Sequence, residues 1–150
     1  MTTDRDVLLA AHRAMRSEFL AAVDGLTEAQ LTERSHNGWS VKDHMAHITF
    51  WDEVRASEVE RISAGLDSAW RLTPEEDETL NAMVTRARWD HSLEQVQREF
   101  TESKQRFLDA LSRATPEGLD ASRYGEAGLV SRHEAEHAGW IREWRAERGY

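Results

Sequence analysis

The chain has 150 residues, no cysteine and a formal net charge of −9, from 28 acidic and 19 basic side chains. This length fits one domain over residues 1–150 whose core needs no disulfides, and the negative charge argues against a nucleic-acid partner because it repels a phosphate backbone. The absence of cysteine, of an apolar leader and of any run of about 18 apolar residues predicts a cytoplasmic protein with no membrane partner.

Helical spacing of apolar residues begins near the N-terminus. A first helix is predicted over residues 4–23, where apolar side chains recur every three or four positions and His12 shares their face. A short capped turn follows at residues 27–31. Ser40 is placed to cap a long second helix over residues 41–64, because its hydroxyl can accept a hydrogen bond from a free backbone N–H group.

Capping boxes and prolines divide the second half of the chain. They predict helices over residues 73–89 and 93–114, followed by an irregular connection at 116–128. A last helix is predicted over residues 130–148. Its inward face is predicted to carry Val130, His133, His137, Trp140, Ile141 and Trp144. No strand-like alternation competes with these helices, so the pattern predicts an all-α bundle.

Two histidines in the last predicted helix have the spacing of metal ligands. His133 and His137 are four positions apart, so their Cβ atoms lie about 5–6 Å apart on one face and both rings can bind one ion. Imidazole nitrogen suits zinc, nickel, copper or iron, and three histidines with an open position are typical of a catalytic site. Spacing alone leaves the third ligand open between His44 and His47. The alternative is a buried or solvated histidine pair without metal.

The same stretch, His133 to His137, also matches the His-Glu-x-x-His motif of zinc peptidases. A peptidase is disfavoured because only 13 residues follow His137, Trp140 stands where the extended motif needs glycine, and no edge strand is predicted. Glu134 and Glu136 remain candidates for proton transfer. Each projects about 100° around the helix from its neighbouring histidine, so a solvated acidic face or a contact behind the ligands is the alternative.

The segment that enters the second predicted helix carries a family resemblance. Its sequence, NGWSVKDHMAHITFW over residues 37–51, resembles the DinB/YfiT-like superfamily and is most like its ClbS/DfsB branch. The later histidine pair follows in the expected order. The resemblance implies a four-helix bundle of up-down-down-up topology with an additional shorter helix, and frequent homodimers. It also implies a divalent transition metal, zinc or nickel, held by His47, His133 and His137.

The resemblance also implies a range of activities. Members of the superfamily include thiol-S-transferases that use a low-molecular-weight thiol, a mycothiol-dependent maleylpyruvate isomerase and a cyclopropane hydrolase in the ClbS branch. We therefore expect a metal-dependent transferase or hydrolase that acts on a small molecule. The ion would generate its nucleophile by lowering the pKa of a bound water or thiol.

Aromatic residues near the predicted ligands are candidates for a substrate pocket. Trp51 and Trp140 follow ligand histidines by four and three positions, although core packing explains both equally well. Arg55 suits a substrate anion or, more simply, a surface ion pair. Two other functions stay open: a binding protein that sequesters a small molecule, and an interaction protein whose exposed aromatics, Trp89 and Trp144, form a dimer face.

Overall fold

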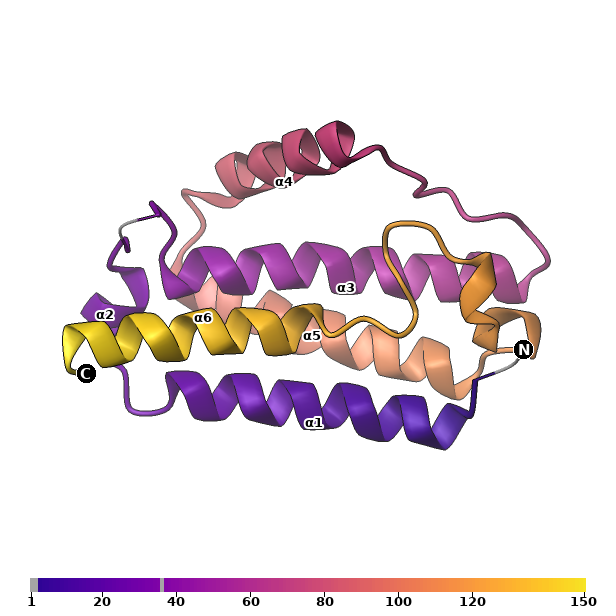
Figure 1. Ribbon diagram of the computed structural model, residues 1–150, viewed down its shortest axis with the longest axis horizontal. Helices are drawn as coiled ribbons and strands as arrows, with labels where there is room; N and C mark the ends of the chain where they lie inside the picture. The colour runs from indigo at the N-terminus through magenta and orange to yellow at the C-terminus, as the bar shows by residue number, and fades with distance from the viewer. Residues whose placement is uncertain (1–2, 36) are drawn as a thin grey trace.

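The computed structural model describes residues 3–35 and 37–150, and within them all regular structure is helical. The α-helices, in chain order, are α1 (Arg5–Val23), α2 (Glu28–Thr32), α3 (Val41–Ser63), α4 (Pro74–Arg88), α5 (Leu93–Ser112) and α6 (His133–Arg148) (Figure 1). Two 3-10 helices, Glu117–Leu119 and Ala121–Arg123, lie in the connection before α6. The prediction of an all-α fold is confirmed. Among the described helices, none is long and apolar enough to span a membrane.

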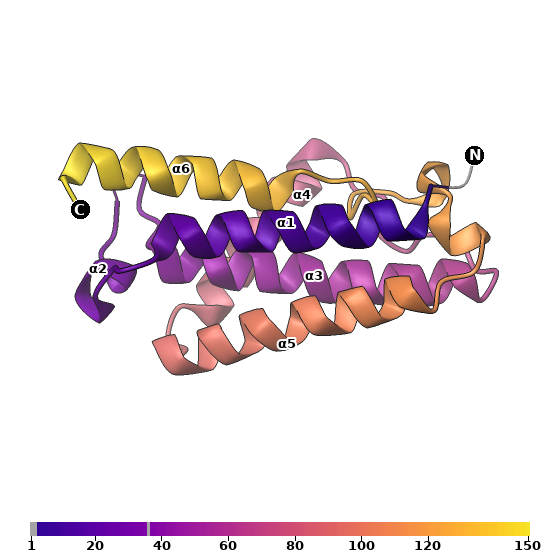
Figure 2. The same cartoon turned by 90° about the horizontal axis from the view of Figure 1, so that it is seen from below.

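Four long helices make up the bundle. α1 and α6 run in one direction while α3 and α5 run in the other, which is the expected up-down-down-up topology (Figures 1 and 2). α1 packs mainly on α6, and α3 packs mainly on α5. α4 lies outside this bundle along α3, within the long crossover that joins α3 to α5 (Figure 1). One face of α3 is therefore covered by the bundle and another by α4.

The start of α3 is fixed by a reciprocal capping box. The Asp43 backbone N–H donates to Ser40 Oγ over 3.1 Å, and the Ser40 N–H donates to Asp43 Oδ2 over 2.9 Å. Arg34 lies 3.3 Å from the same Asp43 carboxylate. Because both orphan N–H groups are satisfied locally, the register of the first turns of α3 is set by sequence. These turns carry His44 and His47.

Aromatic and branched side chains fill the space between the bundle helices. The largest fully buried ones are Phe19, Phe100, Phe107, Ile48, Ile62 and Leu111. Each lies on a stripe that recurs at helical spacing, as the sequence predicts. The apolar contacts hold α1, α3, α5 and α6 together and so fix the positions of these helices relative to one another.

The last helix differs from its prediction at two residues. α6 begins at His133 rather than near Val130, and Val130 is 62% exposed in the preceding connection. Its N-cap, Arg132, makes no side-chain capping bond, and the His133 N–H instead donates to Ser131 Oγ over 3.1 Å. Trp140 is 51% exposed, so its predicted inward position is also wrong. It lies at the edge of the apolar stripe and, as shown below, faces a cavity.

Candidate metal centre

Two helices bring three histidines together. His47 comes from the second turn of α3, and His133 and His137 come from the first turns of α6. The Nε2 atom of His133 lies 2.8 Å from Nε2 of His47 and 3.1 Å from Nε2 of His137. One ligand nitrogen from each residue falls within 4.8 Å of the other two. The structure thus places the predicted ligand set in one cluster.

The donor set fits a divalent transition metal ion. Tetrahedral zinc with bonds of about 2.0–2.1 Å separates neighbouring nitrogens by about 3.3 Å, close to the 2.8 and 3.1 Å that separate His133 Nε2 from the other two rings. Neither Nδ1 of His47 nor Nδ1 of His133 has a hydrogen-bond partner in the described part of the chain. No hydrogen bond among these residues therefore holds either ring through its Nδ1 atom. Three imidazoles without a carboxylate suit zinc, nickel, copper or iron.

The residue that the sequence left as an alternative ligand lies directly behind the cluster. His44 Nδ1 is 2.7 Å from Nδ1 of His137, and both rings are buried. An imidazole that binds metal through Nε2 keeps its proton on Nδ1, so His137 would donate to His44. His44 would then act as the acceptor and carry its own proton on Nε2. This contact orients the His137 ring.

Burial keeps the cluster uncharged at neutral pH. Desolvation lowers the pKa of His44 and of His47 to about 4, and that of His133 to about 2. The pKa of His137 is lowered further, again mainly by burial. The nearby positive charge of Arg55 adds to the effect on His47 and His133. Neutral imidazoles are the form that binds metal, so these residues need not lose protons to do so at pH 7.

A buried network of charged residues lies beside the histidines. Its acids are Asp52 on α3 and Glu134 on α6, and its bases are Arg16 on α1, Arg55 on α3 and Lys104 on α5. Lys104 Nζ lies 3.2 Å from Asp52 Oδ1 and 3.0 Å from Glu134 Oε2. Arg16 contacts the same two carboxylates at 3.2 and 2.5 Å. The network ties the first turn of α6 to the other three bundle helices.

These contacts decide what the predicted catalytic candidates can reach. Glu134 is buried in the network and does not line the cavities at the histidines. Its role is therefore to hold the helices together. Glu136 is exposed and lines a pocket of about 190 Å³ beside His133. Arg55 is buried: its Nη1 lies 3.6 Å from Asp52, and its Nε donates to the Ala127 carbonyl over 2.7 Å. The predicted surface ion pair of Arg55 is therefore wrong.

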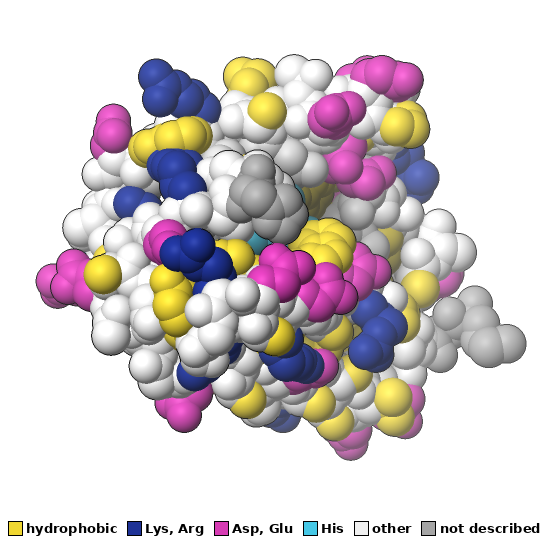
Figure 3. All heavy atoms as spheres, turned by 60° about the vertical axis from the view of Figure 1, so that its left-hand side comes forward, with side chains coloured by type: hydrophobic (Ala, Val, Ile, Leu, Met, Phe, Trp, Pro, Cys, Tyr) yellow, Lys and Arg dark blue, Asp and Glu magenta, His cyan; other side chains and the backbone are white. Residues whose placement is uncertain are grey.

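A cavity of about 550 Å³ opens onto the histidines. It is bounded by α4 on one side and by two tryptophans on the other, and its lining comprises Asn37, Trp39, His44, His47, Asp77, Glu78, Asn81, Ala82, His133, His137 and Trp140. In Figure 3 histidine side chains are visible in a hollow beside hydrophobic and acidic side chains. The smaller pocket shares His133, Asp77 and Asn81 with this cavity. The two pockets together form one groove between α3, α4 and α6.

The tryptophans take different positions around this groove. Trp140 lines the 550 Å³ cavity, whereas Trp51 is 4% exposed, lines the smaller pocket and donates its Nε1–H to Asn81 over 2.8 Å. Trp39 was not singled out from the sequence. Its ring meets those of His44 and His47 edge-on, with centroids 5.2 and 5.1 Å away. Its place just before the Ser40 cap was the available signal.

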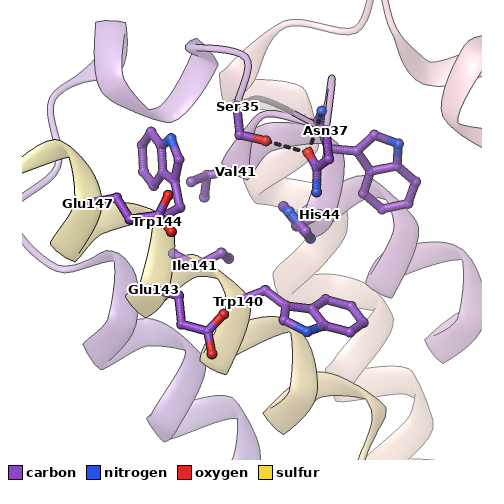
Figure 4. Close-up of a pocket in the computed structure, with 10 residues that line it drawn as sticks. Ser35, Asn37, Val41, His44, Trp140, Ile141, Glu143, Trp144 and Glu147 are labelled. Atoms are coloured by element: carbon purple, nitrogen blue, oxygen red, sulfur yellow. Dashed lines mark hydrogen bonds between the residues drawn. The ribbon is translucent and has the colours of Figure 1, made fainter.

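A third, smaller pocket lies behind His44. It holds about 120 Å³, and His44 and Trp140 line both this pocket and the larger cavity. Figure 4 shows His44 from α3 and Trp140 from α6 facing the same space. Trp144 lines it as well but is 8% exposed and packs on Tyr150, so it does not form the exposed dimer face that we considered. Trp89 is 37% exposed, and the Arg34 guanidinium lies over one face of its ring, 3.5 Å from the ring centre.

Comparison with known proteins agrees with this architecture. The crystal structure of an uncharacterised protein from Escherichia coli UTI89 is similar, with a TM-score of 0.76 over 97% of this chain and 94% of that chain. The sequences are 14% identical, so the likeness concerns the fold alone. No curated protein matches the chain. The family model described as the DinB superfamily matches residues 11–141, a span that contains all three histidines. The chain therefore belongs to the DinB superfamily.

Proposed function

We propose that this protein is a divalent-metal-dependent enzyme that acts on a small molecule, with the ion held by His47, His133 and His137. The observation that carries this proposal is the cavity of about 550 Å³ at the histidine cluster. A structural zinc site is closed by four protein ligands, whereas a catalytic one keeps a position for water or substrate. Three converging histidines beside a cavity favour the second kind.

The surrounding residues suit a reaction of the transferase or hydrolase type. A bound zinc or nickel ion would supply a nucleophile at neutral pH by lowering the pKa of a water or thiol in its open position. Trp39 and Trp140 provide apolar walls beside the histidines. Glu136, an exposed carboxylate next to His133 in the smaller pocket, is positioned to accept a proton. His44 and the Asp52–Glu134 network hold the ligands in place.

Metal analysis tests the site directly. Protein purified without an affinity tag is expected to hold about one equivalent of a transition metal, which His47→Ala and His137→Ala each remove. His91→Ala is the matched control, because it deletes a histidine outside the cluster, near Glu99. Unchanged metal content in His137→Ala, or none in the parent after incubation with zinc or nickel, would overturn the assignment.

Turnover separates the enzyme from a sequestering protein on the same bundle. The cavity is large enough to enclose a small molecule, which is the observation that favours sequestration. The metal-loaded protein should be incubated with excess electrophile, with and without a low-molecular-weight thiol, and with the strained cyclopropanes that the resemblance to the ClbS/DfsB branch suggests. Product beyond one equivalent per site supports the enzyme. Product or binding that stops at one equivalent supports sequestration.

A further inference from the structure

We infer that the groove takes a small organic cation, an amine-bearing molecule whose ammonium group lies at the α4 wall and whose metal-binding end faces the histidines. This inference rests on the proposed function and names the class of its substrate. Its basis is the distribution of charge and aromatic surface around the cavity, set out below.

Acidic side chains dominate the charged surface of the groove. Asp77 and Glu78 of α4 line the large cavity, and none of the described residues that line it is a lysine or arginine. The adjoining pocket adds Glu126 and Glu136. A cleft lined by carboxylates over apolar walls concentrates cations and repels anions. The groove therefore discriminates against substrates whose distal end is negatively charged.

The carboxylates of this wall are free to bind a ligand. Asp77, Glu78 and Glu136 form no salt bridge within residues 3–35 and 37–150, whereas Glu53, on the neighbouring α3, pairs with Arg88 over 3.0 Å. Desolvation and the neighbouring Asp77 together raise the pKa of Glu126. Like charges are thus crowded at this edge of the groove. A bound ammonium group would relieve the repulsion between them.

Arg55 is the one arginine or lysine among the described residues that line the groove, and it does not reverse this preference. Its Nε donates to the Ala127 carbonyl, its Nη1 faces Asp52, and its Nη2 donates to Ser131 Oγ over 3.4 Å. Arg55 is 6% exposed, and its guanidinium forms an ion pair with the buried carboxylate of Asp52. Each of its three nitrogens thus already faces a partner within the protein. Arg55 therefore belongs to the frame and not to an anion site.

The opposite wall suits the apolar part of such a ligand. Trp140 is 51% exposed, and its ring centre lies 4.8 Å from that of His137. Trp39 stacks on His137 from another direction, with ring centres 6.2 Å apart. An aromatic face packs against the hydrocarbon part of a ligand. Tryptophans on one side and carboxylates on the other leave the ligand one favourable orientation.

The inference also restricts any thiol that serves as nucleophile. Metal in the cluster favours a thiolate sulfur at the histidine end, while the α4 wall disfavours carboxylates at the other end. A neutral or amine-bearing thiol satisfies both ends, whereas a thiol that carries several carboxylates does not. The predicted selectivity is thus a property of the distal group of the ligand, independent of its sulfur.

Three para-substituted benzenethiols test this selectivity in the cobalt-loaded protein. They carry aminomethyl, hydroxymethyl or carboxymethyl groups, and their rigid rings prevent both ends from chelating one ion. Binding is followed by the thiolate-to-cobalt charge-transfer absorption. We expect the amine to bind most tightly and the carboxylate most weakly. Each favourable charge contact contributes about a fivefold change in Kd at high effective dielectric, and the preference should shrink as salt is added.

A double variant removes differences in thiol acidity from the comparison. Asp77→Asn/Glu78→Gln should lower the ratio of carboxylate Kd to amine Kd by about five- to tenfold, through loss of the charged wall. Glu94→Gln/Glu102→Gln changes the net charge equally but lies on α5, and neither residue lines the groove. This control should leave the ratio unchanged. Equal ratios in all three proteins, or tightest binding of the carboxylate in the parent, would overturn the inference.

If the proposed metal site is wrong, the experiment gives a different result from a failure of the cation site. In that case no cobalt binds, or no thiol of any charge produces the absorption band. Quenching of tryptophan fluorescence by benzylamine, compared with phenylacetate, then reports on the groove without metal. A preference for benzylamine that disappears in Asp77→Asn/Glu78→Gln would uphold the cation site, and no preference would reject it.

Discussion

Acidic residues lie on two sides of the histidine cluster, in opposite environments. Asp52 and Glu134 are 1% and 4% exposed, and each contacts two or more cationic side chains. Asp77 and Glu78, on α4, face the cavity and form no salt bridge among the described residues. The buried carboxylates form ion pairs within the protein, and the α4 carboxylates form none among the described residues. The first pair thus supports the frame of the site, and the second is available to ligands.

The sharpest test of this contrast compares stability after deleting one acid from each set. Asp52→Ala leaves the buried Lys104 and Arg55, and the partly buried Arg16, with one partner fewer. Removing one partner of a buried ion pair costs about 3–5 kcal/mol. Asp77→Ala should change the free energy of unfolding by less than about 0.5 kcal/mol. Urea denaturation measures both. Similar losses in the two variants would contradict the division of roles.

Acid should destabilise the protein through its buried histidines. The pKa values of His12, His44 and His47 are lowered to about 4, and those of His133 and His137 also lie below the unfolded value of 6.5. The unfolded chain therefore binds more protons than the folded one below pH 6.5. The stability of metal-free protein should fall by a few kcal/mol as pH drops from about 6.5 to 4.

This prediction is tested by measuring the midpoint of urea unfolding at several pH values, with and without zinc. Zinc binds the neutral histidines of the folded protein, so it should raise the midpoint most near pH 7 and least near pH 5. His91→Gln is a control because His91 lies outside the cluster, beside Glu99. A midpoint that stays constant between pH 7 and pH 4 would show that the histidines are not held neutral.

His44 should tune metal affinity without being needed for stoichiometry. His44→Leu removes the acceptor 2.7 Å from His137 Nδ1, and loss of such a partner typically weakens metal binding about 10- to 100-fold. His44→Gln keeps an acceptor and should recover part of the loss. Competition with a chelating indicator gives the affinity, and elemental analysis gives the content. Complete loss of metal in His44→Leu would make His44 a fourth ligand instead.

Local patterns in the sequence were sufficient for the helices and for most of the cluster. The predicted N-caps Thr73 and Ser40 placed helix starts within one residue, because a cap depends on side chains only three positions apart. The His133–His137 pair depends on the pitch of a single helix in the same way. The choice of His47 over His44 required the family resemblance. In the structure His47 belongs to the cluster, and His44 contacts His137 from behind it.

The features that the sequence could not supply depend on how distant helices meet. The contacts of Glu134 with Arg16 and Lys104 join three helices, and no local spacing pairs them. The only signal was Lys104 itself, a charged residue on the apolar stripe of α5 between Phe100 and Phe107. The role of α4 as a cavity wall was likewise hidden. Its mixed, mostly exposed surface does not indicate which side faces α3.

The smallest expected effect concerns the cap that sets the register of His44 and His47. Ser40→Ala removes the acceptor for the Asp43 N–H and should cost about 1 kcal/mol of stability. Ser92→Ala removes the equivalent bond to Gln95 at the start of α5, a helix that carries none of the cluster histidines, at a similar cost. If the α3 cap also positions His47, Ser40→Ala should weaken zinc binding several-fold more than Ser92→Ala does. Equal zinc affinity in two equally destabilised variants would show that packing alone places the α3 histidines, with the cap contributing only to stability.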